Sequence, residues 1–473
     1  MNHDQRQRLL NLIQSFTPTK ILVVGDLILD KYTWGEVERI SPEAPIPVVK
    51  VSKQEFRLGG SASVATNLAK LNCEVEVLGW TGLDESGKAL KSLLEKEKIG
   101  YKHLLELDFS TIVKDRVLTN QQQLLRVDYE GNHALTSDIE PLLIPKIAEA
   151  LRGTSSVVLS DYAKGVLSPT VTAEIIRQAK ALKIPVICDP GKGVPLSQYK
   201  GVTTLKPNRM ETEIATGIKI SDHASLLEAA HIVKSETEAE FLSISLDKEG
   251  ILYYRNPENY QIISTQTLEV FDVTGAGDMV ISIIAALLSA GIDPIDTLHM
   301  ANVASAIEIS HMGVVPIEWR EIQNFLTHDN LHEKIPSFEV IKEERKEIKT
   351  DLIFTNGYFD NLSAGHLRFI LEIGKIPGRL VVAINSDESI ERAKGEKPLL
   401  NQTDRARLLA SLENVWRVVI FDAADASQLI TDLRPQIIVK GDSFQNQKIS
   451  ESEAIAAVGA EVKYLSHFKF SKD

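Results

Sequence analysis

The stretch Ile21-Leu-Val-Val-Gly-Asp26 is an uninterrupted aliphatic run that stops at a glycine and an aspartate. Runs of this kind are typical of parallel strands that are buried on both faces. Similar runs recur at Ser156–Asp161, Ile184–Asp189 and Phe241–Leu246, and helical stretches such as Ser168–Leu182 lie between them. This alternation predicts βαβ units in an α/β fold, a doubly wound sheet with helices on both faces. Because ligands bind at the carboxyl ends of such strands, the aspartates that end three of them indicate the edge that holds the site.

Two segments interrupt this alternation. Tyr32–Val51 and Ile112–Asp128 are rich in residues that favour strands, and the second resembles a hairpin with polar residues on one face. We expect the two segments to form a small accessory β sheet that serves as a lid. The same strands offer a surface through which two copies of the chain could pair, so a homodimer is expected.

The segment Asp272–Asp278 (DVTGAGD) is the candidate reactive centre, because it leads directly into the apolar helical stretch that begins at Met279. Glycines at a helix start let backbone N–H groups converge on an anion, and the helix dipole adds to their effect. A carboxylate at the same place is set to take a proton from a hydroxyl that attacks a phosphate, which is what phosphoryl transfer to an alcohol requires. Taken alone, the motif would equally fit a glycine-rich turn with a helix-capping aspartate.

Two other segments favour the functional interpretation. Arg57–Leu71 puts a glycine pair before a helix of small residues, which permits close approach of a ligand. Lys206–Glu213 supplies Asn208 and Glu211, three residues apart and on the same side of one helical turn. Such a pair suits orientation of Mg²⁺ through its waters rather than full chelation. An Asn-x-x-Glu sequence by itself is mostly a helix start.

Together these segments resemble the ribokinase family, also called the carbohydrate kinase family, over roughly residues 10–320. The resemblance implies a ribokinase-like fold with a small β lid and an ATP-dependent sugar kinase that uses Mg²⁺. It implies that Asp278 is the catalytic base and that Asn208 and Glu211 belong to the Mg-phosphate network. The anion hole would be the backbone of Gly275, Ala276 and Gly277. The residues assigned to the sugar are Asp30, Gly59, Gly60 and Asn67, and the candidates for the nucleotide pocket are Ser245, Gly250 and Asn302.

The segments Gly25–Val51 and Leu159–Ser168 resemble one subgroup of that family, the heptose 7-phosphate kinases that make precursors of bacterial lipopolysaccharide. The implied reaction is phosphorylation of D-glycero-D-manno-heptose 7-phosphate at O1. This substrate carries a dianionic phosphate, so it needs cationic partners. The candidate cations, each of which could also be a solvated surface residue, are Arg39, Arg116, Arg126 and Lys164. Ser63 stands where the subgroup has asparagine, so another sugar or sugar phosphate remains an alternative substrate.

The character of the chain changes around Thr327–Thr350, which is highly charged and contains little that could form a core. A new alternation of strands begins at Asp351–Asp360 and continues through Arg379–Asn385, Trp416–Phe421 and Ile437–Asp442. It predicts a second, smaller Rossmann-like α/β domain. The expected divisions are a kinase domain at residues 1–328, a charged linker at residues 329–350 and a second domain at residues 351–473.

The stretch Thr355–Ile370 places Gly365 and His366 at a helix start after a strand end. It resembles the cytidylyltransferase-like family, in which a His-x-Gly-His motif holds nucleotide phosphates at a helix N-terminus. Both halves together resemble the family of bifunctional heptose kinases and ADP-heptose synthases, whose second half joins ATP and heptose 1-phosphate into ADP-heptose. Ser363 stands where the family has its first histidine, and the ending Phe-Lys-Phe-Ser-Lys-Asp lacks the family's Ser-Thr-Thr segment.

Three interpretations of this second half remain open. It is an active adenylyltransferase with substituted phosphate contacts, or it binds nucleotide and turns over slowly, or it is a structural or regulatory module. The lysines that could supply the substituted contacts are Lys394, Lys397 and Lys440.

The bulk composition bounds the partners and the location. A formal net charge of -13 argues against a nucleic-acid partner, whose phosphates demand a basic surface. The chain has only two cysteines, Cys73 and Cys188, which is too few for a disulfide framework and fits a reducing compartment. The start is too polar for a signal peptide, and the longest apolar run is shorter than the roughly 20 residues that span a bilayer. We therefore expect a cytoplasmic enzyme without membrane partners, whose ligands are a small-molecule sugar phosphate and ATP.

Overall fold

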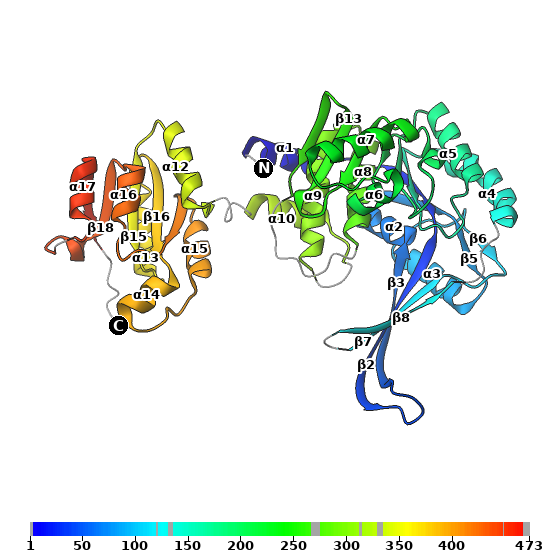
Figure 1. Cartoon of the computed structure of the whole chain (residues 1–473), viewed down its shortest axis with the longest axis horizontal. Coiled ribbons are helices and arrows are strands. Elements are labelled where there is room, and N and C mark those ends of the chain that lie inside the picture. Colours follow the sequence, from blue (N-terminus) through cyan, green and yellow to red (C-terminus); the bar gives the residue numbers. More distant parts are fainter. Residues whose placement is uncertain are drawn as a thin grey trace. The chain divides into compact units, whose positions relative to one another are not determined.

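The computed structural model describes residues 3–119, 122–130, 136–265, 275–311, 315–328, 334–447 and 449–466. The chain forms two compact units, Met1–Leu326 and Thr327–Asp473, each with its own sheet (Figure 1). Within these ranges no helix is both long enough and apolar enough to cross a membrane.

The first unit is built on an eight-stranded sheet in which six neighbouring strands run parallel and two antiparallel strands close one edge. In spatial order the strands are β14 (Asn259–Ile263), β13 (Ile251–Asn256), β12 (Phe241–Ser245), β11 (Thr204–Leu205), β10 (Val186–Asp189), β9 (Ser156–Ser160), β1 (Lys20–Gly25) and β4 (Glu74–Leu78). The four aliphatic runs of the sequence are β1, β9, β10 and β12, as predicted.

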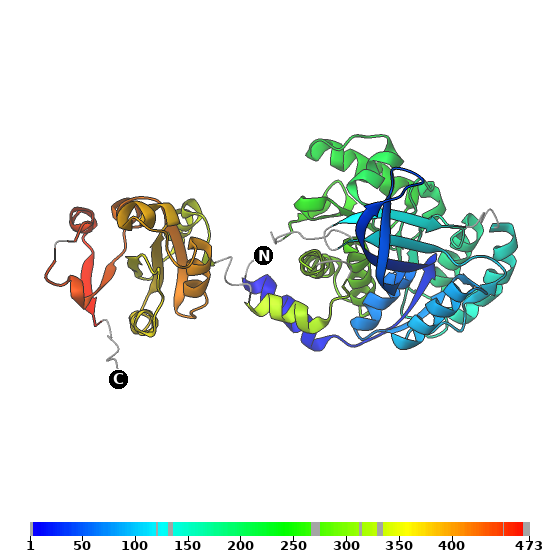
Figure 2. The same cartoon turned by 90° about the horizontal axis from the view of Figure 1, so that it is seen from below.

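Helices cover both faces of this sheet, so the predicted doubly wound arrangement is confirmed. Successive side chains of a strand point to opposite faces, and accordingly Ile21 and Val23 join one core whereas Leu22 and Val24 join the other. The first core is covered by α1 (His3–Ser15), α2 (Ser61–Lys70), α3 (Glu85–Lys96), α8 (Ala276–Ser289), α9 (Pro294–Ile309) and α10 (Trp319–His328). The second is covered by α4 (Thr136–Ala150), α5 (Pro169–Ala181) and α7 (His223–Thr237). The ends of the unit meet where α1 lies beside α10 (Figure 2) and the rings of Phe16 and Trp319 are 4.9 Å apart.

The two segments that interrupt the alternation form one four-stranded sheet, as predicted. Its order is β3 (Pro47–Gly60), β2 (Leu27–Ile40), β7 (Val113–Leu118) and β8 (Gln123–Tyr129). The far ends of β2 and β3 extend well beyond the helices of the unit (Figure 1). Asp30 near the start of β2 lies opposite Arg57 on β3 and Lys114 on β7. This sheet therefore places charged side chains near the carboxyl end of β1, which β2 follows directly.

The second unit has a five-stranded parallel sheet covered on both faces, which confirms the expected Rossmann-like α/β fold. The strand order is β17 (Val415–Phe421), β16 (Arg379–Asn385), β15 (Leu352–Gly357), β18 (Ile437–Gly441) and β19 (Glu461–Leu465). One face packs against α13 (Ala364–Ile373) and α15 (Gln402–Ala410). The other packs against α12 (Phe338–Glu347), α16 (Ser427–Leu433) and α17 (Ser452–Val458), and α14 (Asp387–Lys394) follows β16.

Part of the expected linker at residues 329–350 is a helix of the second unit. Ile341 on α12 is fully buried in that unit's core. Glu344 pairs with Arg417 on β17 at 2.7 Å, and Arg345 donates to the carbonyl of Leu433 at 2.9 Å. The charged residues of this segment therefore serve as tertiary contacts around a narrow apolar stripe, which a reading by composition overlooks. Residues 329–333 lie outside the described residues.

Candidate active sites

The first unit contains a cavity of about 530 Å³ where the four-stranded sheet, which is expected to serve as a lid, meets the start of α8. It brings together residues from seven separate segments of the sequence. The predicted site residues that line it are Asp30, Gly60, Gly275, Gly277 and Asp278, and Ser63 and Arg116 line it as well. The segment 272–274 of the glycine-rich motif lies outside the described residues.

Asp278 lies in the first turn of α8, with Gly275 as the N-cap at a φ of 95°. This left-handed conformation suits glycine, which has no Cβ to clash. The hydroxyl of Tyr162 donates to Asp278 Oδ1 at 3.0 Å, and the Ser63 hydroxyl also hydrogen-bonds this carboxylate. Burial raises the pKa of Asp278, while the contacts with Ser63 and Tyr162 and the Lys206 charge act in the opposite direction. Asp278 is thus a partly buried carboxylate that faces the cavity and is oriented by two hydroxyl groups.

The carboxylate of Asp26, directly after β1, holds the loop that carries Tyr162. It accepts backbone N–H groups from Tyr162, Lys164 and Val166 at 3.0–3.1 Å. Burial raises the pKa of Asp26 to about 6, although these three hydrogen bonds lower it. The Leu159–Ser168 segment resembles one subgroup of the family. Its loop, held by Asp26, places the Tyr162 hydroxyl against Asp278.

The raised pKa of Asp26 predicts that its contribution to stability falls as the pH rises. The carboxyl has an ordinary pKa of 3.8 in the unfolded chain and about 6 in the folded one. Between these values the folded state holds a proton that the unfolded state releases, so the contribution is full below about pH 3.8 and lost above about pH 6. Two pKa units correspond to about 3 kcal/mol. Urea unfolding of the first unit between pH 4 and pH 7 should show a shallower pH dependence for Asp26→Asn than for the natural chain. Equal slopes would contradict the assignment.

Tyr162→Phe should slow phosphoryl transfer without preventing folding. The variant loses one hydrogen bond to a charged group, which is worth about 1.5–3 kcal/mol, so kcat should fall about tenfold to hundredfold. Steady-state kinetics would give the separate changes in kcat and KM. Tyr260→Phe, at a partly exposed tyrosine of β14, is the matched control and should leave both constants unchanged. A natural kcat in Tyr162→Phe would contradict the positioning role.

The side of the cavity that is expected to bind the sugar is strongly charged. Arg116 on β7 donates to Asp30 Oδ1 at 2.6 Å, and both side chains are mostly buried. Lys114 and Arg57 also line the cavity. A Cβ atom at Gly59 would lie 2.4 Å from Asp30 Oδ2, so the missing side chain is what allows the carboxylate to occupy this position. The arrangement offers acceptors for sugar hydroxyls beside cations for a phosphate.

Four side chains that were expected to contact the sugar or its phosphate lie away from the cavity lining. Asn67 is fully buried on α2, one turn after Ser63. The Lys164 ammonium pairs with Glu130 at 2.6 Å. Arg126 pairs with Asp128, and Arg39 is exposed toward the far end of β2. Among the predicted cations, Arg116 is the one that lines the cavity.

Asn208 and Glu211 form a capping box at the start of α6 (Arg209–Thr216). Asn208 Oδ1 accepts the Glu211 N–H and Glu211 Oε2 accepts the Asn208 N–H, both at 2.8 Å. Within the described ranges no group of three or more His, Cys, Asp or Glu residues is arranged to hold a metal ion. The amide and carboxylate oxygens of Asn208 and Glu211 are donors that fit a Mg²⁺ ion held mainly by waters and phosphates.

Lys206 is a candidate residue that the sequence interpretation missed. It follows β11, is buried, and pairs with Asp189 at the end of β10 at 3.1 Å. A Cβ atom at Gly277 would lie 3.4 Å from Lys206 Nζ, so the ammonium lies beside the expected anion hole. Two features of the sequence could have indicated Lys206 as a site residue. It follows a strand end, two residues before Asn208, and Asp189 ends the adjacent strand.

The expected nucleotide contacts Ser245, Gly250 and Asn302 are not brought to the cavity lining. Ser245 bridges to Asn208 through the backbone. Asn302 on α9 donates to the Ile263 carbonyl at 2.6 Å. A Cβ at Gly250, whose φ is 106°, would come within 2.0 Å of that same carbonyl oxygen. Asn302 and Gly250 thus have clear structural roles at the end of β14.

The second unit has its own cavity of about 410 Å³ at the carboxyl ends of β15 and β18. Asn356, Asp360, His366, Lys440 and Glu451 are among the residues that line it. Gly365 is buried in the first turn of α13, next to His366. The cavity therefore lies where this type of sheet binds ligands.

Ser363, which replaces a histidine of the family motif, has become the N-cap of α13. Its hydroxyl accepts the backbone N–H of His366 and lies 3.0 Å from His366 Nδ1. The imidazole of His366 is 5.6 Å from the Phe359 ring, centroid to centroid. The substitution preserves the helix start and holds the remaining histidine at the cavity wall.

The three lysines proposed as substituted phosphate contacts have different surroundings. Lys394 pairs with Asp360 and lies over the Tyr358 ring, whereas Lys397 is exposed. Lys440 is buried and lines the cavity. Lys440 is therefore the lysine of the three that reaches the cavity. The ending Phe468–Asp473 lies outside the described residues.

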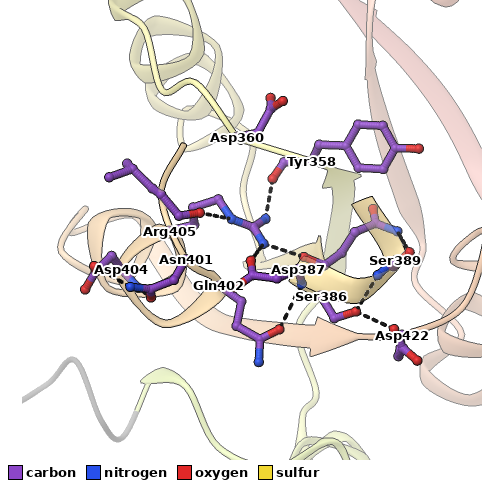
Figure 3. Close-up of polar contacts among 12 residues, drawn as sticks. Tyr358, Asp360, Ser386, Asp387, Ser389, Asn401, Gln402, Asp404, Arg405 and Asp422 are labelled. Atoms are coloured by element: carbon purple, nitrogen blue, oxygen red, sulfur yellow. Dashed lines mark hydrogen bonds and ion pairs between the residues drawn. The ribbon is translucent and has the colours of Figure 1, made fainter. Parts of the chain in front are cut away.

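Arg405 on α15 ties the loops around this cavity together. It is fully buried, and Figure 3 shows its guanidinium between the Tyr358 carbonyl and Asp387. It donates to the carbonyls of Tyr358, Asn385 and Leu400 at 2.5, 2.9 and 3.1 Å, and to Asp387 Oδ1 at 2.7 Å. One side chain thus fixes the carboxyl ends of β15 and β16 relative to α14 and α15.

Comparisons with known proteins agree with this division into two sites. Residues 18–320 match the pfkB family of carbohydrate kinases, and residues 354–463 match the cytidylyltransferase-like family. The chain is 38% identical over 459 residues to the bifunctional protein HldE of Magnetococcus marinus, a match that covers 95% of this chain and 94% of that protein. It is 39% identical over 447 residues to HldE of Campylobacter curvus, with 93% and 94% covered. The predicted order, a sugar kinase followed by a nucleotidyltransferase-like domain, is confirmed.

Solved structures resemble the first unit in fold. Arabidopsis thaliana ribokinase in complex with ribose and ATP matches with a TM-score of 0.54 at 18% identity, covering 66% of this chain and 99% of that one. Phosphofructokinase-2 from Escherichia coli matches with a TM-score of 0.55 at 20% identity, with the same coverage. The likeness confirms the predicted ribokinase-like fold.

Proposed function

The chain belongs to the family of the bifunctional HldE proteins, and on that premise we propose that it catalyses two steps toward ADP-heptose. The first unit phosphorylates D-glycero-D-manno-heptose 7-phosphate at O1 with ATP and gives the 1,7-bisphosphate. The second unit transfers AMP from ATP to heptose 1-phosphate and releases pyrophosphate, supplying ADP-heptose for lipopolysaccharide core synthesis. The observation that carries the kinase assignment is the partly buried Asp278 carboxylate, which faces a charged cavity and is oriented by Tyr162 and Ser63.

In the kinase reaction Asp278 takes the proton of the attacking O1 hydroxyl. Tyr162 and Ser63 hold the carboxylate in place. The backbone N–H groups of Gly275, Ala276 and Gly277 face the transferred phosphoryl group, and the adjacent Lys206 charge adds to their stabilisation.

The sugar phosphate is bound by the lid side of the cavity. Asp30 accepts hydrogen bonds from sugar hydroxyls. Gly59, which has no side chain, leaves room for the Asp30 carboxylate, and Gly60 lines the same cavity. Arg116 and Lys114 neutralise the 7-phosphate, for which charge-assisted hydrogen bonds are the strongest available contacts. Asn67 is a fully buried residue of α2, and neither polar atom of its side chain has a hydrogen-bond partner among the described residues.

We assign the metal role to Mg²⁺, with Asn208 and Glu211 holding its waters. A bound Mg²⁺ neutralises phosphate charge and orients the nucleotide. The capping box keeps both side chains in a fixed orientation at the start of α6.

Adenylyl transfer needs positioning and charge neutralisation rather than an acid or a base. His366 and the N-terminus of α13 are the proposed phosphate contacts, together with Lys440. Ser363 replaces the first histidine of the His-x-Gly-His motif, so one charge-assisted phosphate contact is lost. Such a contact is worth about 1.5–3 kcal/mol, and the reaction should therefore be slower than with the full motif.

One experiment separates the two activities in the full chain. ADP production is followed with a panel of sugars and sugar phosphates, and pyrophosphate release is followed with ATP and heptose 1-phosphate. Heptose 7-phosphate should give the highest kcat/KM for ADP production. Preference for another sugar would overturn the substrate assignment and would implicate Ser63. Absence of pyrophosphate release would leave the second unit as a binding or structural module.

The proposed enzyme is a cytoplasmic homodimer. Support for the dimer is the apolar surface of the lid sheet, on which large hydrophobic side chains are exposed. They are Val37, Ile40, Val51, Phe56, Leu125, Val127 and Tyr129. Light scattering of the full chain tests this assignment, and a monomeric mass at micromolar concentration would overturn it.

A further inference from the structure

The cavity of the second unit contains a closed polar triad that is formed by Asn356, Lys440 and Glu451. The Lys440 ammonium lies 2.8 Å from Asn356 Oδ1 and 3.2 Å from Glu451 Oε2. Asn356 Nδ2 donates to Glu451 Oε1 at 2.9 Å, and the Ser450 hydroxyl donates to Glu451 Oε2 at 3.2 Å. Both oxygens of Glu451 are therefore engaged, and all three members of the triad line the cavity.

The charges of this cavity are unusual for a site that accepts a triphosphate. Lys440 is the only lysine or arginine among the described residues that line it, whereas three carboxylates line it, those of Asp360, Asp425 and Glu451. Polyphosphates are normally met by an excess of cations and N–H donors. Lys394, which pairs with Asp360, is not among the lining residues. Among the described residues that line the cavity, the positive charge available to an incoming phosphate is thus mainly that of Lys440.

Glu451 already occupies the anion position at this lysine. The two side chains are only 8% and 4% exposed, so their interaction is weakly screened by solvent. Burial works against the charged carboxylate, yet Lys440 and the hydrogen bonds hold the pKa of Glu451 below its usual value. The carboxylate is ionised at neutral pH and bonds to Lys440 as a phosphate oxygen would.

We propose that Glu451 lowers the phosphate affinity of the second unit, as an internal competitor that a ligand phosphate must displace from Lys440. The proposal rests on the adenylyl transfer assigned above, since it takes this cavity as the polyphosphate site. Glu451 sits at the N-cap of the short helix α17, which has no side-chain cap bond. Displacement of the carboxylate therefore breaks contacts with Asn356 and Lys440 without breaking a cap of α17.

The test is binding of pyrophosphate, the product of the proposed reaction, to the full chain by calorimetry. Glu451→Gln keeps the size and hydrogen-bonding capacity of the side chain and removes its charge. Its Kd for pyrophosphate should be about tenfold lower than that of the natural chain, the gain from one charge-assisted contact. Glu453→Gln, an exposed glutamate two residues away, makes the same change in net charge and should leave Kd unchanged. The double variant Glu451→Gln with Lys440→Met should lose the gain, which assigns the binding to this cavity rather than to the kinase site.

The outcomes separate this inference from the function on which it rests. Equal Kd values for the natural chain and Glu451→Gln would overturn the competitor role and leave adenylyl transfer intact. Weaker binding in Glu451→Gln would mean that Glu451 positions Lys440 for the ligand, which also overturns the proposal. Absence of pyrophosphate binding in all variants, together with absence of pyrophosphate release from ATP, would overturn both. If Glu451→Gln does not fold, Glu451→Asp, which keeps the charge but shortens the reach, should give a smaller decrease in Kd.

Discussion

Replacing Asp278 with asparagine should abolish ATP-dependent sugar phosphorylation, lowering kcat by about 10²–10⁴ because the hydroxyl loses its proton acceptor. Asparagine has the same shape and can still accept the hydrogen bonds of Tyr162 and Ser63, so nucleotide binding should remain nearly unchanged. ADP production by the full chain measures the effect. Calorimetric titration with a non-hydrolysable ATP analogue checks that the site is otherwise intact.

Pyrophosphate release by the second unit serves as the internal control in the same preparation. It should be equal in Asp278→Asn and in the natural chain, since the two cavities use different residues. A kinase that kept its natural kcat after this substitution would show that another group removes the proton. A loss of both activities would point to misfolding instead of chemistry.

Replacing Arg405 with methionine should have the largest effect on stability. Methionine fills a similar volume but leaves three backbone carbonyls and the Asp387 carboxylate without their donor. Breaking a buried charged contact in this way costs about 3–5 kcal/mol. The unfolding transition of the second unit should move to lower urea concentration, while that of the first unit should not change.

The matched control for this prediction is Arg407→Met on the same helix. Arg407 is exposed, and its contact with Asp404 is a surface ion pair of 3.9 Å, so the variant should unfold like the natural chain. Arg405→Lys should keep a charge but lose the fixed fork geometry, and should fall between the two. Equal unfolding curves for Arg405→Met and Arg407→Met would refute the organising role of Arg405.

The parts of the fold that could be predicted are those in which the hydrophobic pattern of the sequence matches the burial of the side chains. The run Ile21–Asp26 is buried on both faces, so its composition alone indicates a central parallel strand. The hairpin β13–β14 was missed because its strands mix polar and aromatic residues at one sheet edge. The helix Phe338–Glu347 was missed because its buried surface is small, with Ile341 as its fully buried residue, and charged residues dominate its composition.

The site shows the same distinction between local and non-local information. Asp278 could be proposed as a site residue because the glycines and the carboxylate are neighbours in the sequence. Tyr162 and Lys206 reach Asp278 and Gly277 only through the arrangement of β9, β11 and α8, and no sequence spacing records that proximity. Arg405 was overlooked for a related reason, since an arginine on a helix is ordinarily a surface residue.

The long strand β2 has a mechanical consequence for sugar exchange. It contains 14 residues, and Asp30 is its fourth. At about 3.3 Å per residue, Asp30 is roughly 10 Å from the base of the strand and the far end is roughly 43 Å from it. A tilt of about 5° about the base would move the far end by nearly 4 Å but Asp30 by less than 1 Å. Asp30 lies close to the base of the strand, so a tilt that displaces the tip by several ångströms would displace the proposed sugar contact only slightly.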